Sequence, residues 1–127
     1  MSTFNKAILM GNLTGDPQVR STKSGKPVAS FSLALNRSTG SGEQRREETT
    51  FIDVVVWDRL AELAERYLSK GRPVLIEGRL QEDSWQDKQS GQTRKKVRVV
   101  GERLEFVRDG QNRAADQPFE PEPALHD

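Results

Sequence analysis

The chain has 127 residues, of which 33% are hydrophobic and 31% charged, a balance that predicts one domain with a modest core and a very polar surface. It contains no cysteine, no apolar run near the length of a membrane span and no signal-peptide pattern. Disulfides, thiolate metal sites and cysteine nucleophiles are therefore excluded, and we expect a cytoplasmic location. The formal net charge of +1 conceals a division, because residues 1–108 carry 19 Lys and Arg against 14 Asp and Glu, whereas residues 109–127 carry one Arg and five acidic residues. A basic body with an acidic tail suggests that the body binds a polyanion.

Two strands are predicted in the first third of the chain. Residues 4–13 form the first, and Gly11 within it indicates a bend or a bulge. Residues 28–36 form the second, because apolar side chains occupy the odd positions and mostly polar ones the even positions, which is typical of a half-buried strand. Between these strands, Asp16-Pro17 and the segment 24–27 are turn sequences.

The segment 49–57 is the most informative part of the chain. It is dense in β-branched and aromatic residues and predicts a third strand, after a long, mobile hairpin loop over residues 37–48. Successive side chains of a strand point to opposite faces, so Ile52, Val54 and Val56 share a core face and the odd-numbered residues share the other. That second face carries two large aromatic rings, those of Phe51 and Trp57. Their exposure to water is unfavourable unless a ligand covers them.

A single amphipathic helix is predicted after the third strand. Asp58 is placed to cap it, and its apolar residues follow i, i+3, i+4 spacing from Leu60 to Leu68. Gly71 and Pro73 supply the stop signal. This helix is expected to plug the core and to carry no chemistry of its own.

Two further strands are predicted over residues 73–85 and 93–107, joined by a mobile polar loop. Leu80 is placed on the core face of the fourth strand, and Val97 on the core face of the fifth. Later in the fifth strand the inward positions change from odd to even. That change requires one extra residue, and Gly101 is the expected bulge site.

Five strands with one helix between the third and the fourth predict an OB-fold, which is a small, partly open Greek-key barrel. The order of the elements, with long loops after the second and fourth strands, favours this fold over other small barrels. The domain is expected to span residues 1–108. Residues 109–127, in which prolines alternate with acids, are expected to be disordered.

Three aromatic residues are the predicted stacking platforms for unpaired bases, namely Phe51, Trp57 and Trp85. For Phe51 and Trp57 the alternative is a second buried face or a subunit interface. For Trp85, which lies among polar residues, the alternative is an oligomer contact. Phe31 and Phe106 are assigned to the core by their phase.

Cations on the same side of the barrel are the predicted phosphate contacts. Arg79 shares a face with Trp85, and Arg94 and Lys96 share the non-core face of the last strand, while the wider set of basic residues includes Arg37. Neutralising phosphates releases counterions, so affinity is expected to fall with salt at a log–log slope near −0.7 per phosphate. No catalytic arrangement and no metal-ligand set stands out, and the single histidine, His126, is expected to be solvated; we expect no enzyme activity and no cofactor.

Several blocks of the chain, in order, resemble the bacterial single-stranded DNA-binding protein family. They are Asn5 to Leu13 followed by Asp16 to Arg20, Val28 to Ala34, Phe51 to Ala61, Tyr67 to Gly71, and Ile76 to Leu80, with Trp85 where the family carries an aromatic residue. The resemblance covers residues 4–107. It implies an OB-fold that coats single-stranded DNA without strong sequence preference in replication, recombination and repair, in the cytoplasm and in association with the nucleoid.

The resemblance also implies partners and site residues. It implies a homotetramer, with a dimer as the alternative, and base stacking by the three aromatic residues already named. Lys6, Arg20, Arg59 and Lys70 fall on positions that are often basic and near the strand. Asp116, Pro118 and Phe119 resemble the acidic tip through which the family recruits replication and repair proteins.

Two departures from the family pattern matter. Thr39 lies near the place where some members carry a further tryptophan, so one stacking platform is expected to be missing. Eight residues follow Phe119, whereas the family tip ends on the phenylalanine. A partner pocket that reads a terminal carboxylate could not read it at Phe119, and the chain is compatible with a secondary paralogue.

Two other functions remain open from the sequence. The chain is compatible with an OB-fold adaptor whose aromatic face is buried against another protein chain. It is less compatible with an OB-fold hydrolase acting on nucleic acid, because no carboxylate cluster and no internal histidine are present.

Overall fold

The computed structural model describes residues 3–107, and these residues form one mixed sheet with a single α-helix. In chain order the elements are β1 (Ala7–Leu13), β2 (Gln18–Ser21), β3 (Pro27–Thr39), the 3₁₀ turn η1 (Gly42–Gln44), β4 (Arg46–Trp57), α1 (Arg59–Tyr67), β5 (Pro73–Gln86) and β6 (Thr93–Phe106). The proposed acidic tail, with Asp116, Pro118 and Phe119, lies outside the described residues.

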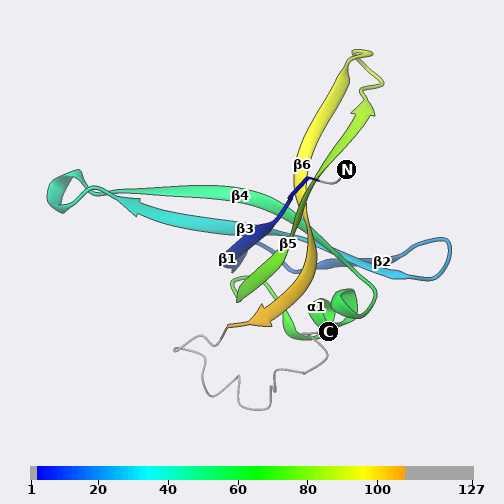
Figure 1. The fold of residues 1–127 in the computed structure, drawn as a ribbon, viewed down its shortest axis with the longest axis horizontal. Helices are drawn as coiled ribbons and strands as arrows, with labels where there is room; N and C mark the ends of the chain where they lie inside the picture. Colours follow the sequence, from blue (N-terminus) through cyan, green and yellow to red (C-terminus); the bar gives the residue numbers. More distant parts are fainter. Residues whose placement is uncertain (1–2, 108–127) are drawn as a thin grey trace.

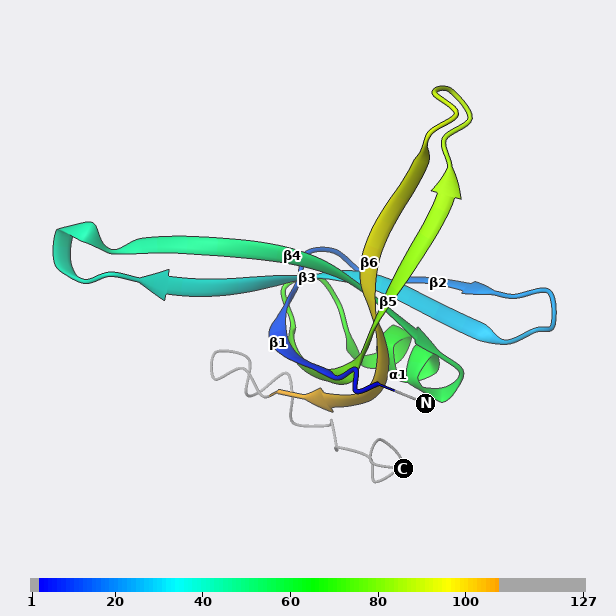
Figure 2. The ribbon, with the colours of Figure 1, turned by 45° about the horizontal axis from the view of Figure 1, so that its top comes forward.

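The strands close into a five-stranded barrel. Their order is β1-β5-β6-β4-β3, and a second pairing between β1 and β3 closes the ring (Figure 2). All neighbours in the ring are antiparallel except β4 and β6, which run parallel where Val54 lies opposite Val99. The predicted OB-fold is therefore confirmed, with its helix between the third and fourth strands of the barrel.

Gly11 allows the ring to close. Up to Asn12, β1 pairs with β5, and its last two residues also pair with β3. A β-carbon on Gly11 would lie 2.5 Å from the carbonyl oxygen of Ala34 and 2.8 Å from Cδ2 of Leu35. The glycine that the sequence marked as a bend or bulge is thus required by the close approach of two backbones.

Replacing Gly11 by alanine is expected to lower the free energy of unfolding by about 1–3 kcal/mol, because the new methyl group would push against a backbone oxygen held in the barrel. Chemical denaturation measures the change. Gly15→Ala is the matched control, since no atom lies within 4 Å of its ideal β-carbon position. Equal stability of the two variants would show that β1 and β3 do not pack this closely.

The core fills the barrel with aliphatic side chains from the predicted inward faces. Leu33, Ile76 and Leu104 are fully buried in it. The helix α1 adds Leu63 and Ala64, as its spacing predicted, and also Ala61, which the predicted stripe did not include. Phe106 packs edge-on against Tyr67 with ring centroids 5.6 Å apart, so the assignment of Phe106 to the core is confirmed, as is that of Phe31.

The predicted bulge in the last strand is also present. Glu77 of β5 lies opposite Arg103, whereas the next residue, Gly78, lies opposite Gly101, so Glu102 is the extra residue. The bulge adjoins the glycine that the sequence selected. It moves Leu104 and Phe106 into the core although Val99 also points there.

The hairpins that leave the barrel differ most from the sequence predictions. Strands β3 and β4 stay paired as far as Thr39 and Arg46, so half of the predicted loop over 37–48 is strand, and residues 18–21 form the short strand β2 where only turns were expected. In Figure 1 the β3–β4 arm and the β5–β6 arm extend from the barrel in different directions. Long antiparallel partners hold these polar segments in strands, although their composition favours loops.

Four local predictions are corrected by the structure. Leu80 and Val97 are 47% and 45% exposed, because the alternation continues into the β5–β6 arm, where no core lies beneath it. Val55 is buried although it belongs to the outward face of β4. Asp58 precedes the helix at φ 57° and makes no side-chain capping hydrogen bond, because its left-handed backbone turns the chain into α1.

Candidate nucleic-acid interface

The strand register gathers the predicted aromatic residues and several cations on one outer surface of the barrel. Residues opposite each other in neighbouring strands point to the same side, and Trp57 lies opposite Val28, Arg20 opposite Val28, and Trp85 opposite Arg94. We call this surface the aromatic face. It consists of Gln18 and Arg20 from β2, Val28, Ser30 and Ser32 from β3, Phe51, Asp53, Val55 and Trp57 from β4, Arg79, Gln81, Asp83 and Trp85 from β5, and Arg94, Lys96, Arg98 and Val100 from β6.

All three predicted stacking platforms remain accessible on this face. Phe51 is 65% exposed, Trp85 50% and Trp57 40%. Their own subunit's interior therefore does not enclose them. Rings that are held at the base by a sheet and open above can receive a flat ligand by stacking.

A small apolar floor lies beneath the aromatic face. Val28, Val55 and Val100 form a second buried cluster, separate from the barrel core. Trp57 lies opposite Val28, and Arg79 lies opposite Val100, so two of the valines have large cross-strand neighbours. Val55 lies opposite Ser30 of β3 and Val100 of β6, and its packing in this cluster explains why it is buried at an outward-facing position.

Most cations of the aromatic face are ion-paired with carboxylates. Arg79 Nη1 lies 2.7 Å from Glu102 Oε2, Arg94 Nη2 3.2 Å from Asp87 Oδ2, and Lys96 Nζ 2.5 Å from Asp53 Oδ2. Arg20 has no ion-pair partner among residues 3–107. These pairs are exposed and weak, so an incoming phosphate can replace the carboxylate.

At the β5–β6 turn, several hydrogen bonds converge on the carboxyl group of Asp87. Asp87 accepts a hydrogen bond from the backbone N–H of Gln89, at 2.9 Å, and this bond is the main reason that its pKa is lowered. Hydrogen bonds from Ser90 and Arg94 lower the pKa further. Asp87 therefore stays charged near neutral pH and orders the turn beyond Trp85.

Four of the predicted cations lie off the aromatic face. Lys6 precedes β1 and pairs with Glu77, and its hydrogen bond and charge lower the pKa of that carboxyl group. On β3, Ala34 lies opposite Phe51 and shares its side of the sheet. Arg37 is three residues further along the strand, so its side chain lies on the other side of the β3–β4 arm. Lys70 follows α1, where its backbone N–H donates to Asp16 Oδ1 at 2.8 Å.

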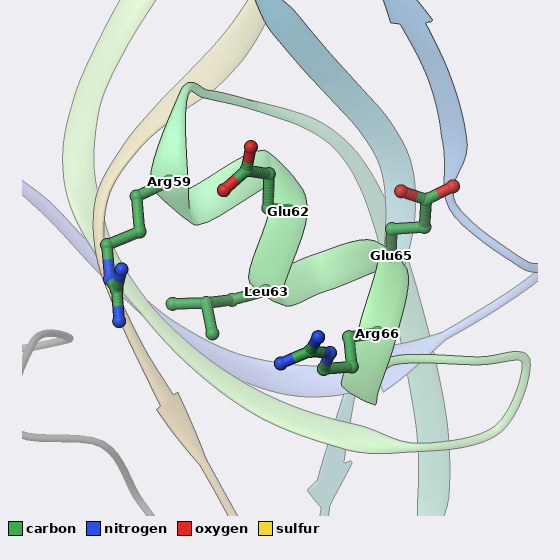
Figure 3. A pocket seen from close by; sticks show the side chains of 5 residues that line it. All are labelled: Arg59, Glu62, Leu63, Glu65 and Arg66. Atoms are coloured by element: carbon green, nitrogen blue, oxygen red, sulfur yellow. The ribbon is translucent and has the colours of Figure 1, made fainter.

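The fourth, Arg59, is the first residue of α1. It borders an open hollow of about 590 Å³ on the helix, together with Glu62, Leu63, Glu65 and Arg66. In Figure 3 Arg59, Leu63 and Arg66 extend from the same side of α1, while Glu65 extends from the other. The structure thus places Arg59 with the helix surface rather than among the three rings.

Sequence reasoning missed part of the site, namely a groove between the rings. Its volume is about 360 Å³, and its polar lining residues are Gln18, Arg20, Ser30, Ser32, Asp53, Asp83, Lys96 and Arg98. Arg98 Nε is buried and lies 2.7 Å from Asp83 Oδ2 without a well-directed hydrogen bond. The parity that selected Phe51 and Trp85 also selects both aspartates, and this was the available signal.

Other kinds of site find no support in the described part of the chain. Residues 3–107 contain no group of three or more His, Cys, Asp or Glu side chains that could hold a metal ion. No helix within that range is long and apolar enough to cross a bilayer.

Comparison with known proteins agrees with this geometry. The sequence profile of the Single-strand binding protein family matches residues 4–107. The chain belongs to this family. Among curated relatives, the single-stranded DNA-binding protein of Treponema pallidum (strain Nichols) is 37% identical over 122 residues, which is 94% of this chain and 68% of the relative. That of Wolinella succinogenes is 44% identical over 105 residues, covering 82% of this chain and 64% of the relative.

A solved structure of a family relative has the same fold. It is described as Plasmodium falciparum SSB complex with ssDNA, and it superimposes with a TM-score of 0.76 at 26% identity, covering 85% of this chain and 98% of that one. The family resemblance inferred from ordered sequence blocks is therefore confirmed. The chain itself spans about two thirds of the length of the curated relatives.

Proposed function

We propose that this protein binds and coats single-stranded DNA without strong sequence preference, by base stacking and phosphate neutralisation, in replication, recombination and repair. Membership of the Single-strand binding protein family makes it a binding protein and not an enzyme. The observation that carries the proposal is the set of three accessible rings on one face, with cations between them. Each stacked base contributes about 1–3 kcal/mol with little sequence preference, which suits a coating protein.

The proposed DNA-binding residues form a centre and a periphery. The centre consists of the aromatic-face residues Phe51, Trp57, Trp85, Arg20, Arg79, Arg94 and Lys96. Lys6, Arg37, Arg59 and Lys70 form the periphery, which a strand contacts only if it continues around the barrel. Titration of intrinsic tryptophan fluorescence with poly-dT at two salt concentrations tests the centre. Absence of both quenching and salt dependence would reject the proposal.

Replacing Arg20 by glutamine is expected to reduce the steepness of the log affinity against log salt plot by about 0.7, which is the contribution of one neutralised phosphate. Arg20 is the best choice because no carboxylate among the described residues already neutralises it. Fluorescence titrations at four or more salt concentrations give the slope. Arg66→Gln on α1 is the control, since it removes the same charge away from the aromatic face; a similar loss in both variants would point to bulk charge instead.

We also propose assembly into a homotetramer, with a dimer as the alternative. Residues 7–11 of β1 have their described strand partners only in β5, which leaves one strand edge open. Ile8 and Met10 on this strand are 63% and 61% exposed. An open edge with apolar side chains favours pairing with a second copy. Light scattering across a concentration series tests the assembly, and a constant monomer mass would reject it.

The remaining proposals concern location and protein partners. We propose that the protein acts in the cytoplasm in association with the nucleoid, since the curated relatives named above are bacterial. Recruitment of replication and repair proteins through Asp116, Pro118 and Phe119 is a separate proposal. Pull-down with wild-type protein and a Phe119→Ala variant tests it, and equal capture by both would reject it.

A further inference from the structure

The hairpin formed by β2 and β3 carries positive charge that no neighbouring carboxylate offsets. No Asp or Glu occurs between Asp16 and Glu43 in the sequence. Within that interval Arg20, Lys23 and Lys26 are exposed, and none of them has an ion-pair partner among residues 3–107. The cations that β5 and β6 contribute to the aromatic face are ion-paired instead. The hairpin is therefore the part of the surface near the rings where a phosphate meets unpaired cations.

The hairpin also continues the aromatic face beyond its last ring. Trp57 is the last residue of β4 and lies opposite Val28, which in turn lies opposite Arg20. Neighbouring strands are about 4.8 Å apart, so the backbone of Arg20 lies roughly 10 Å from that of Trp57 on the same side of the sheet. Figure 1 and Figure 2 show the hairpin extending from the barrel away from the β3–β4 arm. DNA that leaves Trp57 in this direction meets the hairpin next.

Hydrogen bonds hold the tip of the hairpin in one shape. The N–H of Thr22 donates to the carbonyl oxygen of Lys26 at 2.9 Å, which continues the ladder past the ends of both strands. The N–H of Lys26 donates to the Thr22 hydroxyl at 3.1 Å. Lys26 is two residues from Val28, so its side chain lies on the same side as that of Arg20. Lys23 follows Thr22 in the turn, so the three cations run from the aromatic face to the tip.

The chemistry of the hairpin suits the backbone of a nucleic acid and not its bases. Residues 17–30 contain no aromatic side chain on which a base could stack. Ammonium and guanidinium groups donate hydrogen bonds to phosphate oxygens whatever base is attached. Binding a phosphate there releases its counterions and breaks no ion pair within the protein.

We propose that Arg20, Lys26 and Lys23 form a phosphate track that extends the DNA-binding surface beyond Trp57 and holds the DNA backbone without contacting its bases. The inference rests on the proposed binding of single-stranded DNA and adds two lysines and a direction to it. The rings anchor the bases, and the hairpin holds the adjoining phosphates. The segment of DNA that lies over the hairpin therefore needs no bases.

Replacing Lys23 and Lys26 together by glutamine tests the track. For a long oligo-dT, the plot of log affinity against log salt is expected to become less steep by about 1.4, since each neutralised phosphate contributes about 0.7. Fluorescence anisotropy of the labelled strand over a series of salt concentrations gives the slope. The double replacement by arginine is the matched control, because it keeps both charges and both sets of donors, and its slope should equal that of the wild type.

A second measurement separates contacts with the backbone from contacts with bases. An oligo-dT that covers the rings is compared with the same strand carrying a short abasic extension at its 5′ end or at its 3′ end. One of the two extensions is expected to raise the affinity of the wild-type protein at low salt. The glutamine variant should lose this gain, and the arginine variant should keep it.

Three results would overturn the inference. They are an unchanged salt slope in the glutamine variant, a gain from the abasic extension that persists in that variant, and no gain from either extension in the wild-type protein. Failure of the wild-type protein to bind oligo-dT at all would instead reject the proposed function itself.

Discussion

Replacing Trp57 and Trp85 together by alanine is expected to weaken the binding of a single-stranded oligonucleotide by about 2–6 kcal/mol, since each stacked base contributes about 1–3 kcal/mol. Both rings are accessible, at 40% and 50%, and both lie on the aromatic face. These are the only tryptophans in the chain, so the variant has no intrinsic tryptophan fluorescence. Anisotropy of a fluorescein-labelled oligo-dT should be used to measure its affinity.

Phe4→Ala provides the control for this double variant. Phe4 is 91% exposed and precedes β1, so it belongs to none of the strands that build the aromatic face. Its removal should leave the affinity within twofold. If the double variant bound oligo-dT as tightly as the Phe4 variant, the assigned surface would be wrong, and a protein-binding role for the rings would gain support.

Replacing Leu33 by alanine is expected to lower the free energy of unfolding by about 2–5 kcal/mol, because the change removes buried methyl groups and leaves a cavity. Leu33 has no exposed surface and lies in the middle of the barrel core on β3. Urea denaturation followed by circular dichroism measures the loss. The effect is large compared with the stability of a domain of this size, so the variant should be studied at low temperature.

Leu80→Ala is the matched control, since it removes the same atoms from a side chain that is 47% exposed on the β5–β6 arm. A loss below about 1 kcal/mol is expected there, because little apolar area returns to water. Should both leucines prove equally costly, the arm would have to be covered in solution by another chain, for instance a second copy of this protein.

Alternation along single strands predicted most of the core and the three exposed rings, although it misplaced Leu80 and Val97 in the core. The odd positions of β3 and the even positions of β4 identified one face of each strand, and Phe51, Trp57 and Trp85 fell on the other. Local information also located the helix and the bulge beside Gly101. These features depend on spacing within one segment, which a sequence displays directly.

Features that depend on pairing between distant segments were not predictable in the same way. The β3–β4 arm is long because its two strands stay paired as far as Thr39 and Arg46. The polar composition of this segment favoured a loop. Val55 is buried because neighbours from β3 and β6 cover it. Leu80 is exposed because strand β5 extends beyond the barrel core at that point. The ion pairs that neutralise Arg79 and Lys96 likewise join separate strands.

Successive side chains of β4 point to the core and to the outer surface in turn, so neighbouring substitutions in this strand change different properties of the protein. Substitutions at Val54 or Val56 are expected to affect folding, whereas substitutions at Phe51 or Asp53 are expected to affect the proposed binding of DNA, because the two sets project from opposite sides of the same backbone. A lineage can therefore alter its ligand preference by drift at the outward positions while the barrel persists. Val55 is the exception, since it faces outward but is buried. A substitution there is expected to change both the stability of the fold and the outer surface.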